Sequence, residues 1–172
     1  MSKPPAQPIT IRPAESGDRP ALARIHADVA RYYHEIRSDY FERQAPEGFA
    51  GQLAAQAAEP AQSRATCLVA EAQGAVVGAL VARLVAPREQ PGGDRKADVS
   101  SPALRIEYLA TAAAWRRRGI GTRLVQAAEA WGRTSGATVA ETTTFQGSPL
   151  SVPFWEDRMG YEELSINLRK HL

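Results

Sequence analysis

Three consecutive arginines and two spaced glycines form the part of the sequence best suited to chemistry. Between a strand-like stretch and a helical pattern, the chain reads Arg116-Arg117-Arg118-Gly119-Ile120-Gly121. Backbone N–H groups at the N-terminus of a helix point outward with the positive end of the helix dipole, and glycines let an anion approach without a Cβ in the way. We therefore expect this turn to bind phosphate.

Two common phosphate-binding motifs do not fit the turn. No Gly-Lys-Ser/Thr closes it, as a Walker loop requires, and the third glycine of a dinucleotide fingerprint is missing. The alternative is that the three arginines only line a solvated surface. Their place beside two glycines at the start of a helix favours a ligand.

The elements that must position this turn follow from apolar periodicity. Residues 104–111 alternate as a strand with two different faces, a 3.6-residue stripe predicts a helix over 119–134 that Gly136 ends, and residues 138–144 again resemble a strand. One face of the first strand would carry Leu104, Ile106, Tyr108 and Ala110, and the other Arg105, Glu107, Leu109 and Thr111. This order predicts a parallel strand–helix–strand unit.

The rest of the chain supplies further elements of a mixed α/β fold. We expect a strand over 9–12 that Pro13 ends, a helix that Asp18 caps, and a hairpin over 67–86 that turns at Gln73-Gly74 with a bulge at Gly78. Less regular patterns predict a mobile tail over 1–8, a weak helix over 49–57, a loop that could act as a flap over 87–103, a short helix over 149–159 and a last strand over 161–168.

Composition limits the function classes. The 172 residues suit one domain, and 21 basic against 19 acidic residues leave a net charge of only +2, too little to build a strong nucleic-acid surface. Cys67 is the one cysteine, more easily understood as a core residue than as a nucleophile, and the three histidines are not at metal-ligand spacing. With no signal peptide and no apolar run of membrane-spanning length, we expect a soluble, cytoplasmic protein.

The arginine–glycine turn resembles the Gln/Arg-x-x-Gly-x-Gly/Ala signature with which the GNAT N-acetyltransferase superfamily grips the pyrophosphate of acetyl-CoA. The strand at 104–111 looks like the fourth strand of that family, residues 76–78 resemble its third, and FWEDRMGY at 154–161 resembles its late Phe-Tyr-x-x-x-Gly-Phe motif. The likeness covers residues 9–172 as one domain. It implies a mixed, mostly antiparallel sheet with helices on both faces and a parallel strand–helix–strand unit for acetyl-CoA.

The resemblance implies an enzyme that moves an acetyl group from acetyl-CoA directly to an amine of unknown identity, without a metal. The pantetheine arm would lie where residues 109–111 and 142–144 separate, and a backbone N–H near Leu109 or Ala110 would stabilise the oxyanion. The residues it places on the cofactor are Leu109, Ala110, Thr111, Arg116, Arg117, Arg118, Gly119, Ile120, Gly121, Thr122, Ser148, Ser151 and Trp155.

A carboxylate must take a proton from the attacking ammonium, and we expect Glu107 to do so, with Glu141 on the other wall in reserve. The alternative for Glu107 is an ordinary solvent-facing position. Trp155 stands where the family commonly has the tyrosine that protonates the CoA thiolate, and Ser148 where it often has an asparagine. A simpler account makes Ser148 a helix cap and Ser151 a polar helix position.

Two other functions remain open at this stage. The departures at Trp155 and Ser148 fit a domain of the same fold that binds acyl-CoA as a sensor without turnover. A nucleic-acid module built on the three arginines is disfavoured, because no basic stretch with interleaved aromatics accompanies them. We expect a small-molecule or peptide amine as partner, its pocket built by residues 30–50 and 87–103, and no nucleic acid or membrane; a homodimer is common in the family.

Overall fold

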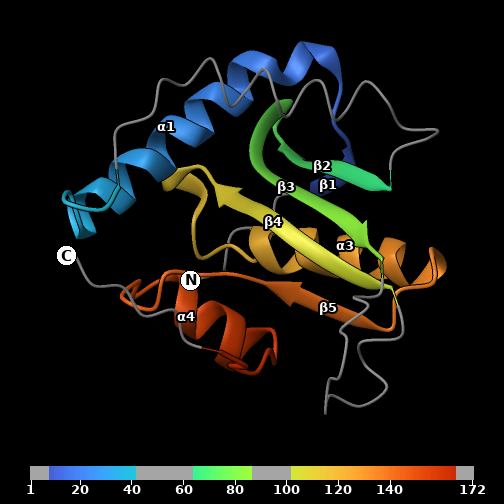
Figure 1. The fold of residues 1–172 in the computed structure, drawn as a ribbon. Coiled ribbons are helices and arrows are strands. Elements are labelled where there is room, and N and C mark those ends of the chain that lie inside the picture. Colours follow the sequence, from blue (N-terminus) through green and yellow to red (C-terminus); the bar gives the residue numbers. More distant parts are fainter. Residues whose placement is uncertain (1–7, 42–63, 87–101, 166–172) are drawn as a thin grey trace, which may run out of the picture.

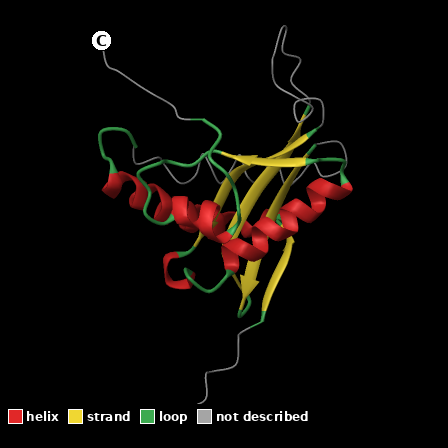
Figure 2. Ribbon diagram, turned by 90° about the horizontal axis from the view of Figure 1, so that it is seen from below, coloured by secondary structure: helices red, strands yellow, loops and turns green. Residues whose placement is uncertain are grey.

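Five strands form one sheet in the order β1-β2-β3-β4-β5 in the computed structural model, which describes residues 8–41, 64–86 and 102–165 (Figure 1). The strands are β1 Ile9–Pro13, β2 Ala65–Ala72, β3 Ala75–Val85, β4 Ala103–Thr111 and β5 Val139–Thr142. Neighbours are antiparallel from β1 to β4, whereas β4 and β5 run parallel. The predicted hairpin and the predicted parallel unit are both confirmed, in a sheet that twists strongly (Figure 2).

Two long helices cover opposite faces of the sheet. Helix α1 (Arg19–Ile36) buries Leu22 and Ile25 against one face, and α3 (Ile120–Thr134) buries an apolar stripe against the other. Gly136 has a φ of 90° and follows the end of α3, as predicted. No helix in the described residues is long and apolar enough to cross a membrane.

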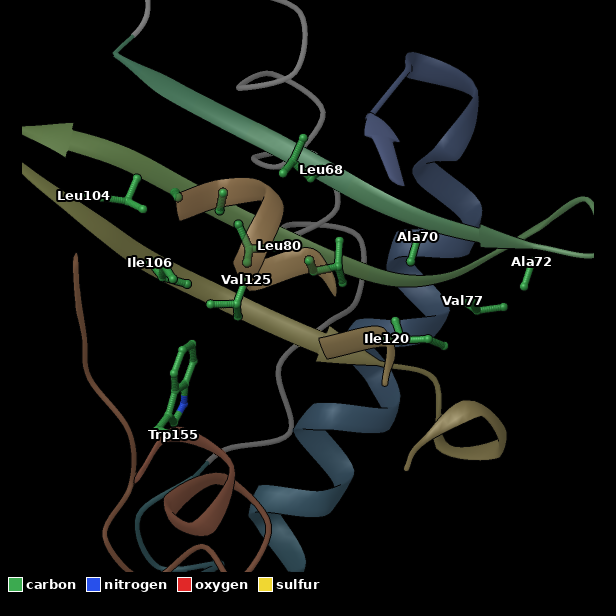
Figure 3. Close-up of a cluster of buried hydrophobic side chains, with 13 residues drawn as sticks. Leu68, Ala70, Ala72, Val77, Leu80, Leu104, Ile106, Ile120, Val125 and Trp155 are labelled. Atoms are coloured by element: carbon green, nitrogen blue, oxygen red, sulfur yellow. The ribbon is translucent and has the colours of Figure 1, made fainter. Parts of the chain in front are cut away.

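The larger part of the core lies between the sheet and α3 (Figure 3). Leu104 and Ile106 of β4 meet Ile120 and Val125 of α3 there, and Trp155, just after the short helix α4 (Ser151–Pro153), closes the cluster. A smaller cluster on the α1 side includes the buried Cys67, in agreement with a core role for this residue.

A bulge marks β3 at the expected place. Ala70 pairs with Gly78 and Glu71 with Val76, so Val77 is the extra residue beside Gly78. A Cβ on Gly78 would lie 2.7 Å from Cγ2 of Ile120. The glycine therefore lets the first turn of α3 rest directly on the sheet.

A second bulge, which the sequence analysis does not predict, interrupts β4 at Glu107. Val81 pairs with Tyr108 and Ala82 with Ile106, so Glu107 is the extra residue and has no backbone register partner on β3. The two faces change places at the extra residue: Ile106 and Leu109 belong to the α3-side core, and Tyr108 packs on the α1 side. The expected regular alternation over 104–111, with Ile106 and Tyr108 on one face and Glu107 and Leu109 on the other, is therefore wrong.

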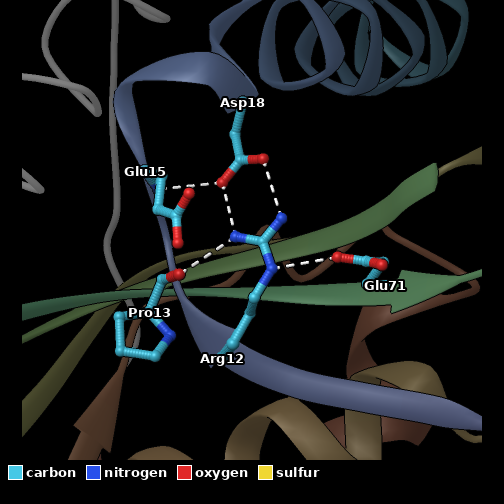
Figure 4. Close-up of polar contacts among 5 residues, drawn as sticks. All are labelled: Arg12, Pro13, Glu15, Asp18 and Glu71. Atoms are coloured by element: carbon cyan, nitrogen blue, oxygen red, sulfur yellow. Dashed lines mark hydrogen bonds and ion pairs between the residues drawn. The ribbon is translucent and has the colours of Figure 1, made fainter. Parts of the chain in front are cut away.

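The start of α1 departs from the prediction in a similar way. Asp18 occupies the N-cap position, as predicted, but its side chain makes no cap hydrogen bond. Both of its oxygens accept hydrogen bonds from Arg12 at 2.8 and 2.9 Å, and Arg12 Nε also donates to Glu71 at 3.0 Å (Figure 4). The carboxylate thus joins β1, β2 and the turn before α1 instead of capping the helix.

The C-terminal elements are partly as expected. The short helix predicted over 149–159 is present as α4 (Ser151–Pro153), which continues into a π-helical turn over Phe154–Arg158. Residues 161–165 form no strand, because exposed neighbours such as Glu162 and Glu163 leave no alternating apolar face. The remainder of that predicted strand, the tail, the weak helix and nearly all of the predicted loop fall in residues 1–7, 42–63, 87–101 and 166–172, outside the described residues.

Candidate acetyl-transfer site

Strands β4 and β5 pair over only four residues and then separate. The parallel ladder runs from Ala103 and Val139 to Ile106 and Thr142, where Thr142 Oγ1 donates a hydrogen bond of 3.1 Å to the carbonyl of Ile106. Beyond this point β4 continues to Thr111 and pairs with β3 alone. Residues 109–111 therefore lie beyond the ladder, as expected, although Thr142, expected in the separated part, is still paired with Ile106.

The backbone of β4 beyond the ladder has a definite orientation. The N–H of Ala112 donates to the carbonyl of Val77 at 2.9 Å. Because hydrogen-bonded and non-bonded pairs alternate along an antiparallel ladder, Ala110 also bonds to β3, whereas the N–H groups of Leu109 and Thr111 face the side that β5 has left. Two residues, Leu109 and Ala110, are candidates to stabilise the oxyanion. The N–H of Leu109 faces the side that β5 has left, whereas the N–H of Ala110 is bonded to β3.

The arginine–glycine turn leads from β4 into α3 as expected. Gly119 occupies the N-cap position with a φ of 78°, and no side chain caps the helix. The first bond of the helix runs from the N–H of Arg123 to the carbonyl of Gly119 at 3.1 Å. The preceding N–H groups of residues 120–122 have no partner within the helix, so they and the helix dipole can receive an anion.

The three arginines of the turn differ in their contacts. Arg116 Nε donates to the carbonyl of Thr111 at 3.4 Å, and its guanidinium lies 5.3 Å from the ring centroid of Tyr32 on α1. Arg118 lies 4.8 Å over the ring of Trp115. Arg117 is exposed and has a φ of 62°. The turn therefore concentrates positive charge beside the uncapped start of α3.

The two glycines of the turn have separate reasons to be there. A Cβ on Gly121 would lie 3.3 Å from the ring of Phe154, so this glycine allows α3 to pack closely against the segment that follows α4. A Cβ on Gly119 would meet nothing within 4 Å, and its positive φ is the feature that suits glycine. Both glycines are expected to leave room for an anion. For Gly121 this is corrected, because the position that its Cβ would take faces Phe154.

Both candidate bases take part in ion pairs on the α1-side face of the sheet. Glu107 pairs with Arg83 at 2.6 Å, and Glu141 pairs with Arg105 at 3.0 Å. Arg83, Arg105 and Glu141 are cross-strand neighbours on β3, β4 and β5, so their side chains share one face. Glu107 occupies the bulge, directly after the last β4 residue that pairs with β5. Bulges are frequent next to active sites.

Ser148 and Ser151 lie at the start of α4, and both contact α1. Ser148 is only 2% exposed, and its Oγ accepts the N–H of Ser151 at 3.1 Å, the kind of contact that a capping serine makes. That Oγ also lies 3.0 Å from the hydroxyl of Tyr32, and Tyr33 lies 2.9 Å from Ser151 Oγ in the same way. No local sequence pattern indicates either tyrosine, since 116 positions separate Tyr32 from Ser148.

Trp155 is a core residue. It is 7% exposed, its ring centroid lies 5.0 Å from that of Tyr161, and it belongs to the α3-side core. The hydroxyl of Tyr161 donates to Glu129 at 3.1 Å, and burial, followed by the negative charge of Glu129, raises the pKa of Tyr161.

The segment after Trp155 contains one residue more than the motif it resembles. Four residues separate Trp155 from Gly160, where the motif has three. A π-helical turn accommodates the extra residue, with the N–H of Met159 bonded to the carbonyl of Phe154 at 3.1 Å. Counting this interval in the sequence would have predicted the irregularity.

The described residues contain no group of three or more side chains suited to a metal.

Comparisons with known proteins agree with this arrangement. A family model described as the acetyltransferase (GNAT) family matches residues 29–161. No curated protein matches the sequence significantly. Among solved structures, a mutant of the BH1408 protein from Bacillus halodurans has a TM-score of 0.81 at 20% identity, over 95% of this chain and 99% of that chain.

Two similar structures contain ligands. An aminoglycoside acetyltransferase from an uncultured soil metagenomic sample, solved with sisomicin, has a TM-score of 0.60 at 19% identity, over 95% of this chain and 96% of that one. The aminoglycoside N-acetyltransferase AAC(6')-Iy, solved with CoA, has a TM-score of 0.60 at 17% identity, over 99% and 100%. At these identities the likeness shows a shared fold.

Proposed function

Because the chain belongs to the GNAT acetyltransferase family, we propose that it transfers an acetyl group from acetyl-CoA directly to an amine of a small molecule. The observation that carries the proposal is the separation of β4 from β5 beside the uncapped start of α3. An extended pantetheine arm can lie along the free edge of β4, while its pyrophosphate meets the exposed N–H groups of a helix.

The chain offers a binding partner for each part of this donor. The N–H groups of residues 120–122 and the side chains of Arg117 and Arg118 would hold the pyrophosphate. The N–H of Thr111 would pair with the pantetheine arm, and that of Leu109 would donate to the thioester oxygen as negative charge develops there. All of these groups follow one another along β4 and the turn into α3.

Acetyl transfer also requires a neutral amine. Glu107 lies on the α1-side face at the point where the β4–β5 ladder ends, two residues before Leu109. An amine that approaches from this face would give a proton to Glu107, directly or through water, and then attack the carbonyl carbon. Glu141 stays in reserve, one strand away and bound to Arg105.

The acceptor is proposed as a small amine because two structures of the same fold are named as aminoglycoside acetyltransferases, one with sisomicin bound. Sisomicin is therefore the first acceptor to test, followed by a panel of simpler amines. The alternative is an acyl-CoA sensor without turnover, which Trp155 in place of the usual tyrosine would favour.

Binding at the turn can be tested by titrating CoA into the protein in a calorimeter. Arg117→Gln removes one charge at the start of α3, and Arg133→Gln removes one at its other end, where Arg133 pairs with Glu129 and is 69% exposed. Losing one charged contact should weaken CoA binding by about tenfold in the first variant and leave it unchanged in the second. Equal affinities in the wild type and both variants would place the pyrophosphate elsewhere.

Turnover can be followed as thiol release from acetyl-CoA with sisomicin. The chain's own thiol does not interfere, because burial raises the pKa of Cys67 to about 11. We expect thiol release together with acetylated sisomicin in the mass spectrum, and no acetylated protein when the amine is omitted. CoA binding without thiol release for any amine of the panel would support the sensor, and acetylated protein would contradict direct transfer.

A further inference from the structure

Helix α1 links the two chain segments that diverge beyond the end of the β4–β5 ladder. On one side, Asp28 accepts the N–H of Ala113 at 3.4 Å, and the ring of Tyr32 lies under the guanidinium of Arg116. On the other side, the hydroxyl of Tyr32 meets Ser148, which follows β5. Tyr32 therefore lies between the turn that leaves β4 and the segment that leaves β5, and its hydroxyl is held by a buried partner.

A proton donor at this place would assist the reaction. When the amine displaces the thioester sulfur, CoA leaves as a thiolate, which is better stabilised if it receives a proton as the C–S bond breaks. Trp155 is enclosed in the α3-side core, and the hydroxyl of Tyr161 donates a hydrogen bond to Glu129. The contacts of Tyr32 join both sides of the separation.

We propose that Tyr32 donates the proton that the departing CoA thiolate takes up. This inference rests on the proposed function. The amine, which has given one proton to Glu107, forms a bond from its nitrogen to the carbonyl carbon, and the nitrogen then loses a second proton to water. The C–S bond then breaks, its electron pair goes to sulfur, and the Tyr32 hydroxyl proton moves to that sulfur, after which the phenolate recovers a proton from water. Ser148 orients the hydroxyl and Arg116 stabilises the transient phenolate.

Tyr33 provides a matched control for this role. It is the next residue of α1, and its hydroxyl also bonds to a serine of α4, at 2.9 Å from Ser151. The ring of Tyr33 contacts the rings of Tyr32 and Phe41. Within the described residues it makes no ring contact with the arginine–glycine turn. Tyr32→Phe and Tyr33→Phe therefore each delete one hydroxyl that links α1 to α4, but only Tyr32 lies beside the turn that follows β4.

The expected loss is moderate, because a thiol of pKa about 8.5 is a fair leaving group even without an acid. In Tyr32→Phe, kcat for acetyl transfer to sisomicin, or to the best amine of the panel, should fall about tenfold or more. KM for acetyl-CoA and the calorimetric affinity for CoA should stay within about twofold of the wild type, and the solvent deuterium isotope effect on kcat should change. Tyr33→Phe should keep a kcat near that of the wild type.

Two results would overturn the role of Tyr32 while leaving the proposed function intact. One is an unchanged kcat in Tyr32→Phe. The other is a loss that Tyr33→Phe reproduces, or that accompanies an equal loss of CoA affinity, since both indicate a contact that only holds α1 to α4. A wild-type protein that binds CoA and releases no thiol would remove the proposed function and this inference together. Thermal unfolding of both variants verifies that each is folded.

Discussion

Two groups of carboxylates and arginines lie on the same sheet and differ in how completely they are enclosed. In the first group, Asp18 takes two hydrogen bonds from Arg12 and one from the N–H of Glu15, and its side chain is 10% exposed. In the second, Glu107 takes a single ion pair from Arg83, and its side chain is 31% exposed. Residue types alone do not separate the two groups, but the number of donors and the exposure do.

The comparison shows which carboxylate can exchange protons with a ligand. The hydrogen bonds from Arg12, more than the opposing effect of burial, lower the pKa of Asp18, so this group stays ionised and structural. Arg12 also binds Glu71, which ties β1 to β2, and it donates to the carbonyl of Pro13 at the end of β1. Among the described residues Glu107 pairs with Arg83, and it lies in a bulge where two strands separate.

The largest effect expected from this difference is on the rate. Glu107→Gln keeps the shape of the side chain and removes its basicity, so turnover at neutral pH should fall by at least about tenfold and by up to about 10⁴-fold. CoA affinity should stay near that of the wild type, because backbone groups and arginines hold the cofactor. Part of the rate should return as pH rises, since free amine then forms without help.

The control for that variant is Glu141→Gln, which removes the carboxylate on β5. If Glu141→Gln loses activity while Glu107→Gln retains it, the base lies on β5. If neither variant changes thiol release with acetyl-CoA and sisomicin, solvent deprotonates the amine and the assignment of Glu107 is wrong.

The next effect is on stability and belongs to the enclosed group. Arg12→Met keeps an apolar stem but leaves the Asp18 carboxylate without its charged partner. Removing one member of a largely buried pair should lower the free energy of unfolding by about 2–4 kcal/mol. Urea unfolding at neutral pH measures the change, and CoA affinity of the folded protein should be unaffected. A loss below about 1 kcal/mol would show that Arg12 is no more structural than an exposed arginine.

The pH dependence of stability sharpens the same contrast. Because the folded protein lowers the pKa of Asp18 from its ordinary 3.8, the carboxylate stabilises the fold fully above that value, and this stabilisation is lost as pH falls through the lower, folded-state pKa. Asp18→Asn has no such group. The difference in unfolding free energy between wild type and variant should therefore be constant above about pH 5 and shrink below about pH 4. Urea unfolding over this range tests it, and a difference that stays constant to about pH 2 would contradict it.

The sequence predicts the framework of the site because the framework depends on local patterns. Apolar periods of 2 and 3.6 residues indicate β4, α3 and β5, and a strand–helix–strand order of this kind gives a parallel pair whose ladder can end early. The turn from Arg116 to Gly121 is likewise local, so its place at the start of α3 could be predicted residue by residue.

The rest depends on contacts that leave no local pattern. The bulge at Glu107 is hidden because Leu104, Ile106, Tyr108 and Ala110 look like an unbroken alternation, although the pairing with β3 slips after Ile106. The bond from Tyr32 to Ser148 and the Arg12–Asp18–Glu71 group join residues far apart in the chain. Only packing in three dimensions brings such residues together.

The smallest effect should come from Arg83, the partner of Glu107. Arg83 is 52% exposed, so water and salt screen its pair, and Arg83→Met should lower the free energy of unfolding by less than about 1 kcal/mol. Arg105→Met, which breaks the pair with Glu141, is the matched variant and should cost a similarly small amount. In the activity assay Arg83→Met should differ from the wild type far less than Glu107→Gln does, since the proposed base is still present. If Arg83→Met instead destabilises the protein as strongly as Arg12→Met, Glu107 is a structural residue of the β3–β4 pair, and the distinction between the enclosed and the accessible carboxylate fails.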